Sequence, residues 1–205
     1  MIRLGECWTI ILASMIVFSL IYVFSPILAV LPGLFILFTL FFFRDPERII
    51  PGREGVLVSP ADGTVLDVEE FEDEFVGKSM RLSIFMSAFN VHVNRAPMDA
   101  KVASVRHTPG RKVTAYKKGD LTVRERNRIE FEGTFRIAVE QYAGIFARRI
   151  VCFINEGDIV SKGGRIGMIK YGSRVDVLMP LNVKVIVSKG DNLTAGESMI
   201  GVIDE

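Results

Sequence analysis

The sequence predicts a mainly β protein, a flattened barrel or sandwich of short hairpins that follows an N-terminal transmembrane helical hairpin. Three observations predict this class. Residues 7–43 contain no charged side chain, short β-branched runs follow from residue 55 onward, and one Gly-Asp pattern occurs twice near the C-terminus. We therefore expect a membrane anchor over residues 1–44 and a separate β-rich domain over residues 45–205.

Composition narrows the classes of function. The chain has 205 residues and a mean hydropathy of +0.33, and its 25 Lys and Arg nearly balance its 24 Asp and Glu. A net charge of +1 gives no indication of nucleic-acid binding, so no nucleic-acid partner is expected. Cys7 lies at the edge of the apolar segment and Cys152 lies in an expected strand, so we expect no disulfide between them and two reduced thiols. The chain has only two histidines, His92 and His107. A zinc site would need more His or Cys residues at close spacing, so we expect no metal site.

The uncharged run is long enough to cross a membrane. A span needs about 20 apolar residues at a rise of 1.5 Å each. Residues 7–43 supply two slightly short spans, 7–24 and 27–43, separated by Ser25 and Pro26. Proline lacks a backbone donor and disfavours helix in the residue before it, which favours a helical hairpin. A single tilted or kinked helix is the alternative.

The charges that flank this run predict its orientation. Arg3 precedes the run, and Arg44 and Arg48 follow it. Positive residues favour the cytoplasmic side, so a hairpin would place both of its ends and the following domain on the cytoplasmic side of the cell membrane. A cleaved signal peptide is disfavoured, because its apolar core would be only about 7–15 residues long.

The second part of the chain has the texture of a β domain. Short β-branched runs alternate with Gly, Asp and Asn turns, and no helical period persists beyond ten residues. We expect strands of four to six residues around 56–58, 64–66, 82–85, 136–139, 150–154, 175–178 and 183–187.

A short repeat lies within this domain. Residues 157–169 and 190–203 both read Gly-Asp-x-[Val/Leu]-x-x-Gly and then continue into an apolar strand. The paired glycines are typical of turns that need a positive φ. Two such units predict the hairpin barrel of lipoyl and biotinyl carriers, which is an analogy of shape and not of function.

Three segments place polar groups within apolar patterns. They are residues 59–63 (Ser-Pro-Ala-Asp-Gly), 89–95 (Phe-Asn-Val-His-Val-Asn-Arg) and 171–176 (Tyr-Gly-Ser-Arg-Val-Asp). The first is also readable as a plain Asp-Gly turn. In the second, strand alternation would put Asn90, His92 and Asn94 on one face.

These segments belong to a longer series of motifs. In order, the series is FFFRDPER at 41–48, SPADGTV at 59–65, SIFMSAFNVHVNRAP at 83–97, GIFARRIVC at 144–152 and GGRIGMIKYGSRVDVLMP at 163–180. Over residues 41–203 the chain thereby resembles the short form of the phosphatidylserine decarboxylase family, including its archaetidylserine branch.

The resemblance implies a proenzyme that cleaves itself between Gly172 and Ser173. Ser173 would become a covalent pyruvoyl cofactor, and chains 1–172 and 173–205 would remain associated. The β-rich domain would then be catalytic. It would decarboxylate the serine head group of a membrane phospholipid through a pyruvoyl Schiff base and release the ethanolamine lipid. Diacyl and archaeal ether lipids share this head group, and both substrates stay open.

The resemblance also implies roles for individual residues. Ser173 would be the nucleophile, with Asp62 and His92 as the base and its orienting group. The long forms carry a second His where this chain has Arg95, which leaves two alternatives open: His92 serves in both self-cleavage and decarboxylation, or a water molecule takes the place of the second His. Candidate substrate-binding residues are Arg174, which could contact a phosphate or carboxylate, and Asn90 and Asn94.

Two other classes of function compete with this one. A membrane-anchored carrier or adaptor would need a modifiable lysine at a hairpin tip, and Lys162 is the nearest candidate. A serine hydrolase would use Ser173 and His92, but the chain has no Gly-x-Ser-x-Gly nucleophile elbow there. The sequence leaves a homo-oligomer open.

Overall fold

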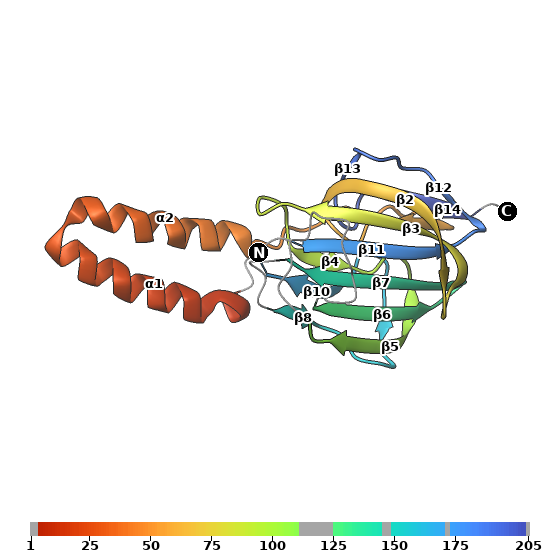
Figure 1. Cartoon of the computed structure of the whole chain (residues 1–205), viewed down its shortest axis with the longest axis horizontal. Coiled ribbons are helices and arrows are strands. Elements are labelled where there is room, and N and C mark those ends of the chain that lie inside the picture. Colours follow the sequence, from red (N-terminus) through yellow and green to blue (C-terminus); the bar gives the residue numbers. More distant parts are fainter. Residues whose placement is uncertain (1–3, 111–124, 145–148, 171–172, 204–205) are drawn as a thin grey trace. The chain divides into compact units, whose positions relative to one another are not determined.

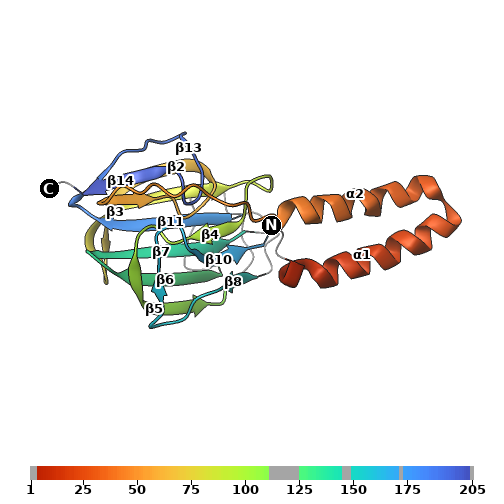
Figure 2. The ribbon, with the colours of Figure 1, turned by 180° about the vertical axis from the view of Figure 1, so that it is seen from behind.

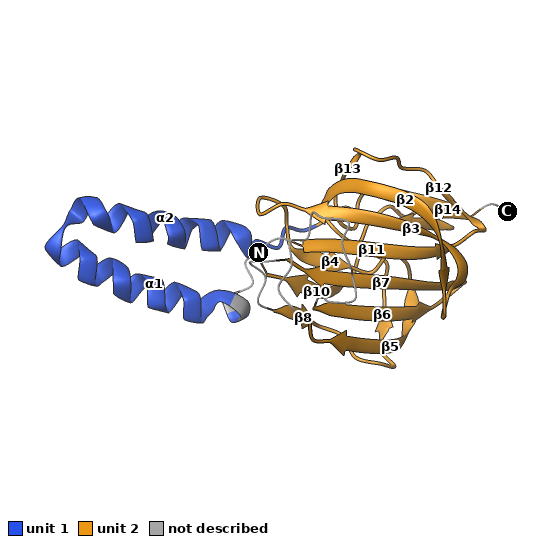
Figure 3. Ribbon diagram, in the orientation of Figure 1, with its two compact units in different colours: residues 1–47 blue, residues 48–205 orange. Residues whose placement is uncertain are grey.

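The computed structural model describes residues 4–110, 125–144, 149–170 and 173–203. The chain forms two compact units, residues 1–47 and residues 48–205 (Figure 3). The first unit is helical and the second consists of β-sheets.

The helical unit is a pair of apolar helices, α1 (Leu4–Phe24) and α2 (Pro26–Phe42). Ser25 caps α2 by accepting a hydrogen bond from the Leu28 amide on its side-chain oxygen (3.5 Å), and Pro26 takes the first helical position, where no amide donor is needed. The predicted helix pair and its break at Ser25-Pro26 are confirmed. Within α1, residues 7–24 have a mean hydropathy of 2.3 and are long enough to cross a membrane, whereas α2 is shorter.

In the described part of the second unit, antiparallel strands form one eight-stranded sheet and two three-stranded sheets (Figure 1). The large sheet has the order β13-β2-β3-β11-β7-β6-β5-β9. Its strands are β2 (Gly63–Asp73), β3 (Gly77–Met86), β5 (Ala100–Thr108), β6 (Arg126–Glu132), β7 (Arg136–Ala143), β9 (Ile159–Val160), β11 (Ser173–Pro180) and β13 (Asn192–Leu193). The small sheets are β1 (Val56–Val58), β14 (Met199–Ile203) and β12 (Val183–Val185), and β4 (Val93–Arg95), β10 (Arg165–Ile169) and β8 (Ile150–Cys152).

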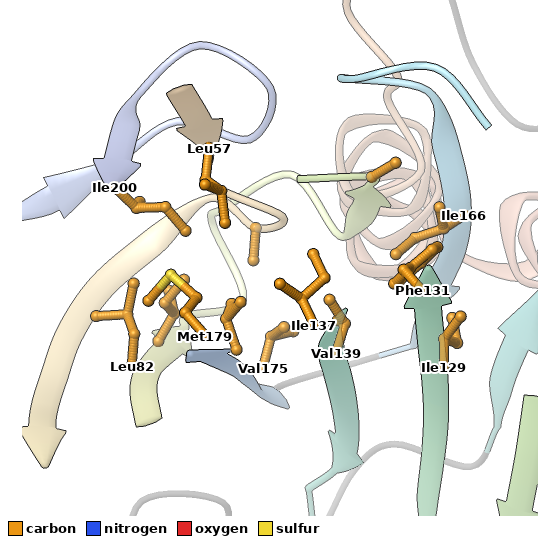
Figure 4. Close-up of a cluster of buried hydrophobic side chains, with 14 of the residues drawn as sticks. Leu57, Leu82, Ile129, Phe131, Ile137, Val139, Ile166, Val175, Met179 and Ile200 are labelled. Atoms are coloured by element: carbon orange, nitrogen blue, oxygen red, sulfur yellow. The ribbon is translucent and has the colours of Figure 1, made fainter. Parts of the chain in front are cut away.

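Both small sheets cover the same face of the large sheet, and the apolar core lies between them (Figures 1 and 2). Figure 4 shows Leu57 and Ile200 of one small sheet and Ile166 of the other, all pointing toward the large sheet. Each buried aliphatic side chain of this kind contributes about 1.5–3 kcal/mol. The large sheet therefore has an apolar inner face and a separate outer face.

The mainly β prediction is confirmed, and so is the conformation expected for the repeated turns. Gly157, Gly163, Gly190 and Gly196 all have positive φ, between 76° and 96°. At Gly163 a Cβ would also meet the Ile50 side chain at 2.2 Å, so the turn has no room for a larger residue.

Four strands, β2, β3, β7 and β11, are longer than predicted, and the first two extend furthest. β2 has 11 residues and β3 has 10, because the hairpin continues past its apolar segments into charged ones. There Arg81 of β3 contacts Glu69 of β2 at 2.6 Å across the strands. Charge pairs across two strands stabilise a β-hairpin. A prediction based on apolar runs does not detect such polar extensions of a strand.

Candidate active site

Ser173 is the first residue of β11, in the middle of the large sheet. Its neighbours in register are Met86 at the end of β3 and Ala143 at the end of β7. The side chain is fully buried, and its Oγ donates to the Met86 sulfur at 3.1 Å. Gly172, the residue expected on the other side of the cleaved bond, lies outside the described residues.

Strand alternation places Ser173 on the inner face of the large sheet. Val175 and Val177 lie on the same face and belong to the apolar core. Arg174 and Asp176 therefore lie on the outer face. A hydroxyl buried at the margin of an apolar core is shielded from water and has few polar partners, which are conditions that strengthen the effect of each nearby donor.

Asn94 reaches the same point from β4. Its side-chain Nδ2 donates to the backbone carbonyl of Pro60 at 3.3 Å and to the Met86 sulfur at 3.7 Å. Ser173 and Asn94 thus converge on the sulfur of Met86, although they belong to different sheets.

His92 lies just before β4 and is completely buried. Its Nδ1 is 2.9 Å from the backbone carbonyl of Asn90. A carbonyl only accepts, so this contact assigns the proton to Nδ1 and leaves Nε2 of the neutral ring with a lone pair. The His92 carbonyl accepts from the Ile169 amide at 3.3 Å. The backbone of His92 is therefore hydrogen-bonded to the last residue of β10, four positions before Ser173 in the sequence.

Asn90 has a different environment from the one predicted. β4 begins only at Val93, and Asn90 belongs to a turn in which its amide donates to the Ser87 carbonyl at 3.0 Å. Its side-chain Oδ1 accepts from the amide of Ser87 at 2.8 Å and from the hydroxyl of Ser87 at 2.7 Å. The strand expected over residues 89–95 is therefore shorter, because this side chain stabilises a turn in its place.

Asp62 lies in the turn before β2, and its carboxylate is held on two sides. Arg48 Nη2 is 2.9 Å from both carboxylate oxygens, and the amide of Ala195 donates to Oδ1 at 2.7 Å. The contacts of the described residues do not connect Asp62 to Ser173 or His92. The turn that contains Asp62 is instead connected to the site by the Pro60 carbonyl, which accepts from Asn94 Nδ2.

The start of β2 lies at the same end of the sheet as Ser173. Thr64 pairs with Phe85, and Phe85 pairs with Arg174. With strands about 4.8 Å apart, two strand spacings separate the starts of β2 and β11 by about 10 Å.

Arg174 is engaged on the outer face, away from Ser173. Its guanidinium contacts both oxygens of Asp176, at 2.6 and 2.8 Å, and donates to the Ser83 hydroxyl at 2.7 Å. Burial lowers the pKa of Arg174, but the hydrogen bond to Asp176 and the charge of that carboxylate outweigh this and raise it. The structure does not bring Arg174 together with Ser173.

We expect Arg174→Met to destabilise the fold and to leave the KM for the substrate unchanged. Removing one partner of a buried ion pair leaves Asp176 uncompensated, which costs about 3–5 kcal/mol. Urea unfolding should show this loss, and Arg174→Met/Asp176→Leu should recover most of it. A raised KM with unchanged stability would instead indicate that Arg174 contacts the substrate.

Sequence reasoning missed three residues around the site: Met86, Asn127 and Gln141. Gln141 is an uncharged polar residue on the inner face of the large sheet, next to the core residue Val175 in register. Its Nε2 donates to Asn94 Oδ1 at 2.7 Å, and Asn127 Nδ2 donates to its Oε1 at 2.8 Å. Strand alternation could have predicted that Gln141 lies on the inner face, but it could not have predicted that its hydrogen-bond partner would be Asn94 of β4.

Comparison with known sequences shows the family to which the chain belongs. The sequence model of the family described as phosphatidylserine decarboxylase matches residues 35–201. The chain is 47% identical over 169 residues to the phosphatidylserine decarboxylase proenzyme of Chlorobium chlorochromatii, covering 82% of this chain and 80% of the relative. It is 44% identical over 178 residues to the proenzyme of the same name from Syntrophus aciditrophicus, covering 85% and 84%.

A serine that is buried at the head of a central strand is thus found in a chain whose relatives are named decarboxylase proenzymes. The protein is a decarboxylase, an enzyme of the lyase class. The chain belongs to the phosphatidylserine decarboxylase family, as its ordered motifs predicted.

Proposed function

We propose that the chain cleaves itself between Gly172 and Ser173 and that the mature enzyme decarboxylates the serine head group of a membrane phospholipid. The substrate would be phosphatidylserine or its archaeal ether counterpart, archaetidylserine. The observation that carries the proposal is the buried Ser173 Oγ at the first residue of β11, four positions after Ile169, whose amide donates to the His92 carbonyl. The names of the relatives supply the reaction and the term proenzyme.

Self-cleavage follows from ordinary serine chemistry. Ser173 Oγ attacks the carbonyl carbon of Gly172, His92 Nε2 takes the hydroxyl proton, and the peptide nitrogen leaves as the amine of Ser173. The resulting ester loses the α-proton of residue 173 and expels the Gly172 carboxylate, which leaves dehydroalanine. After tautomerisation, water replaces the nitrogen and ammonia departs. The products are chains 1–172 and 173–205, the latter beginning with a pyruvoyl group.

The surroundings of Ser173 fit a pyruvoyl group at this position. The group supplies an electron sink for the electrons left by carbon dioxide, which a serine side chain cannot do. Asn94 Nδ2, which shares the Met86 sulfur with Ser173 Oγ, is the donor placed to hold a carbonyl oxygen there. We assign to His92 the movement of protons during self-cleavage and, in the absence of a second histidine at position 95, during decarboxylation as well.

The pairing of the strands supports stable association of the two chains after cleavage. β11 is flanked by β3 and β7 of the long chain along most of its length. β14 pairs with β1, and β13 pairs with β2. The short chain would therefore be hydrogen-bonded into two sheets without a covalent link.

Asp62 would contribute to the reaction indirectly, by holding a turn of the backbone in place. Its carboxylate joins Arg48 of the long chain to the Ala195 amide of the short chain. Two residues earlier, the Pro60 carbonyl accepts from Asn94. We therefore propose that Asp62 fixes the turn that orients Asn94, in place of a direct contact with His92.

The apolar helices would anchor the enzyme where its substrate resides. Trp8 is largely exposed near the start of α1, where an aromatic ring suits a membrane interface. Anchoring would raise the effective concentration of a lipid head group that never leaves the bilayer. We place the β domain on the cytoplasmic side because Arg44 and Arg48 follow the helices.

The carrier alternative finds no support at Lys162. Its Nζ donates to the Arg53 carbonyl at 2.8 Å, and its amide donates to Asp99 at 2.9 Å. A modified lysine must instead be free to enter another protein's active site.

The proposed reaction is testable with the purified full-length chain in lipid vesicles. With phosphatidylserine vesicles, the wild-type protein should release carbon dioxide and form the ethanolamine lipid in equal amounts. Vesicles containing archaetidylserine form a second arm that separates the two lipid classes. Absence of carbon dioxide release from both lipids by a fully cleaved protein would contradict the assigned substrate class.

A further inference from the structure

A line of three buried carboxamides crosses the protein toward the candidate active site. It runs from Asn127 on β6 through Gln141 on β7 to Asn94 on β4, and none of the three is more than 2% exposed. Asn127 Nδ2 donates to Gln141 Oε1 at 2.8 Å, and Gln141 Nε2 donates to Asn94 Oδ1 at 2.7 Å. The line ends with Asn94 Nδ2, which faces the Pro60 carbonyl and the Met86 sulfur.

Every bond in this line has the same direction. Each amide nitrogen donates to the next residue, so the orientation of one carboxamide sets the orientation of the next. Reversing Asn94 alone would place its amino group against the amino group of Gln141 and would turn its oxygen toward the Met86 sulfur. Leaving such buried groups unsatisfied costs about 1–3 kcal/mol each. Gln141 therefore keeps the donor end of Asn94 directed to the site.

The backbone leaves space for this line to pass between sheets. Gly167 of β10 is the register partner of Asn94. A Cβ at Gly167 would lie 3.0 Å from Gln141 Nε2 and 2.7 Å from the Val151 carbonyl. A glycine at this position lets the Gln141 side chain cross from the large sheet to β4.

The end of the line coincides with the reacting group. Asn94 Nδ2 and Ser173 Oγ are both hydrogen-bonded to the sulfur of Met86, at 3.7 and 3.1 Å. A thioether is only a weak acceptor, so both donors can leave the Met86 sulfur and form a hydrogen bond with a stronger acceptor when one appears. Negative charge develops on Ser173 Oγ as it loses its proton and passes to the carbonyl oxygen of Gly172 during the attack.

We infer that Gln141 and Asn127 are positioning residues for self-cleavage, because they hold the Asn94 amide N–H ready to donate to the charge that develops beside Ser173. This inference rests on the self-cleavage proposed above. A donor fixed before reaction needs no reorganisation, and the loss of one such donor costs about 10²–10³-fold in rate.

The main test variant reverses the direction of the hydrogen bonds in the line and leaves Asn94 itself unchanged. In Gln141→Glu the carboxylate can only accept, so Asn94 must turn its amino group to residue 141 and its oxygen to the site. Self-cleavage, followed on gels after synthesis of the proenzyme, should slow by about 10²-fold, as should Asn94→Asp, which lacks the donor. Asn127→Asp should slow cleavage in the same direction by reversing Gln141. Gln141→Leu frees Asn94 without reversing it and should slow cleavage only a few-fold.

A second measurement separates orientation from packing. In the Gln141→Glu variant, the carboxyl group introduced at position 141 donates to Asn94 once it is protonated, which restores the orientation of Asn94. The cleavage rate of this variant relative to wild type should therefore rise as the pH falls. Folding is checked in a Ser173→Ala background by urea unfolding, and rates are taken on the folded fraction. Asn192→Asp makes the same chemical change at an exposed residue outside the line and should leave the rate unchanged.

The outcomes are distinct. Folded Gln141→Glu or Asn127→Asp that cleaves at the wild-type rate would overturn the inference. So would Gln141→Leu slowing cleavage as much as Gln141→Glu, since that pattern indicates packing alone. If Gln141→Glu does not fold, Asn127→Asp provides the same comparison. If the wild-type chain is not cleaved before Ser173, it is the proposed function that fails.

Discussion

Replacing Ser173 with alanine is expected to give one uncleaved chain that does not decarboxylate phosphatidylserine. The change removes a single oxygen, and with it both the nucleophile and the precursor of the pyruvoyl group. Ser173 Oγ has one described hydrogen bond, to the Met86 sulfur, so its loss should cost the fold about 1 kcal/mol or less. Denaturing gels and carbon dioxide release should therefore show complete loss, while urea unfolding shows a nearly unchanged midpoint.

Two matched variants complete this experiment. Ser188→Ala removes the same oxygen from an exposed position and should leave cleavage unaffected. Ser173→Cys retains a nucleophile and should cleave, although more slowly. A Ser173→Ala protein that is cleaved, or that forms the ethanolamine lipid, would place the cofactor at another residue.

Replacing His92 with glutamine should slow self-cleavage by about 10²–10⁴-fold, the range expected for a lost general base. The amide of glutamine can approximate the contact of His92 Nδ1 with the Asn90 carbonyl, but it cannot take the proton from Ser173. Time courses on gels, started when the proenzyme has been synthesised, measure this rate.

The chain supplies the control for this prediction. His107 lies on β5 with a half-exposed side chain that contacts Glu125 at 3.1 Å. His107→Gln removes the same imidazole at a distance from the described site residues and should cleave normally. Equal rates for the two variants would exclude His92 as the base.

Local patterns were sufficient to predict much of the fold. The helix break at Ser25-Pro26 follows from the chemistry of proline, and the positive φ values at Gly157 and Gly190 follow from the repeated turn. β-Branched runs located four of the eight strands of the large sheet, namely β2, β3, β7 and β11. These features depend on residues close together in the chain, which a sequence displays directly.

The partners of the site residues could not be predicted in this way. Arg174 was expected at the substrate, yet its guanidinium contacts Asp176 and Ser83 on the outer face. Asn94 was expected at the site without any indication of Gln141, which is 47 positions away in sequence. Strand order and the packing of one sheet on another decide such contacts, and both depend on pairings between distant segments.

Intact mass measurement of the purified wild-type protein tests the central claim most directly. We expect two polypeptides, residues 1–172 with an ordinary carboxyl end and residues 173–205 lighter by one ammonia than a serine-initiated fragment would be. An amine-reactive label should leave the terminus of the short chain unmodified. An intact chain of 205 residues that still decarboxylates the lipid, or a short chain that begins with an ordinary amino group, would contradict the account.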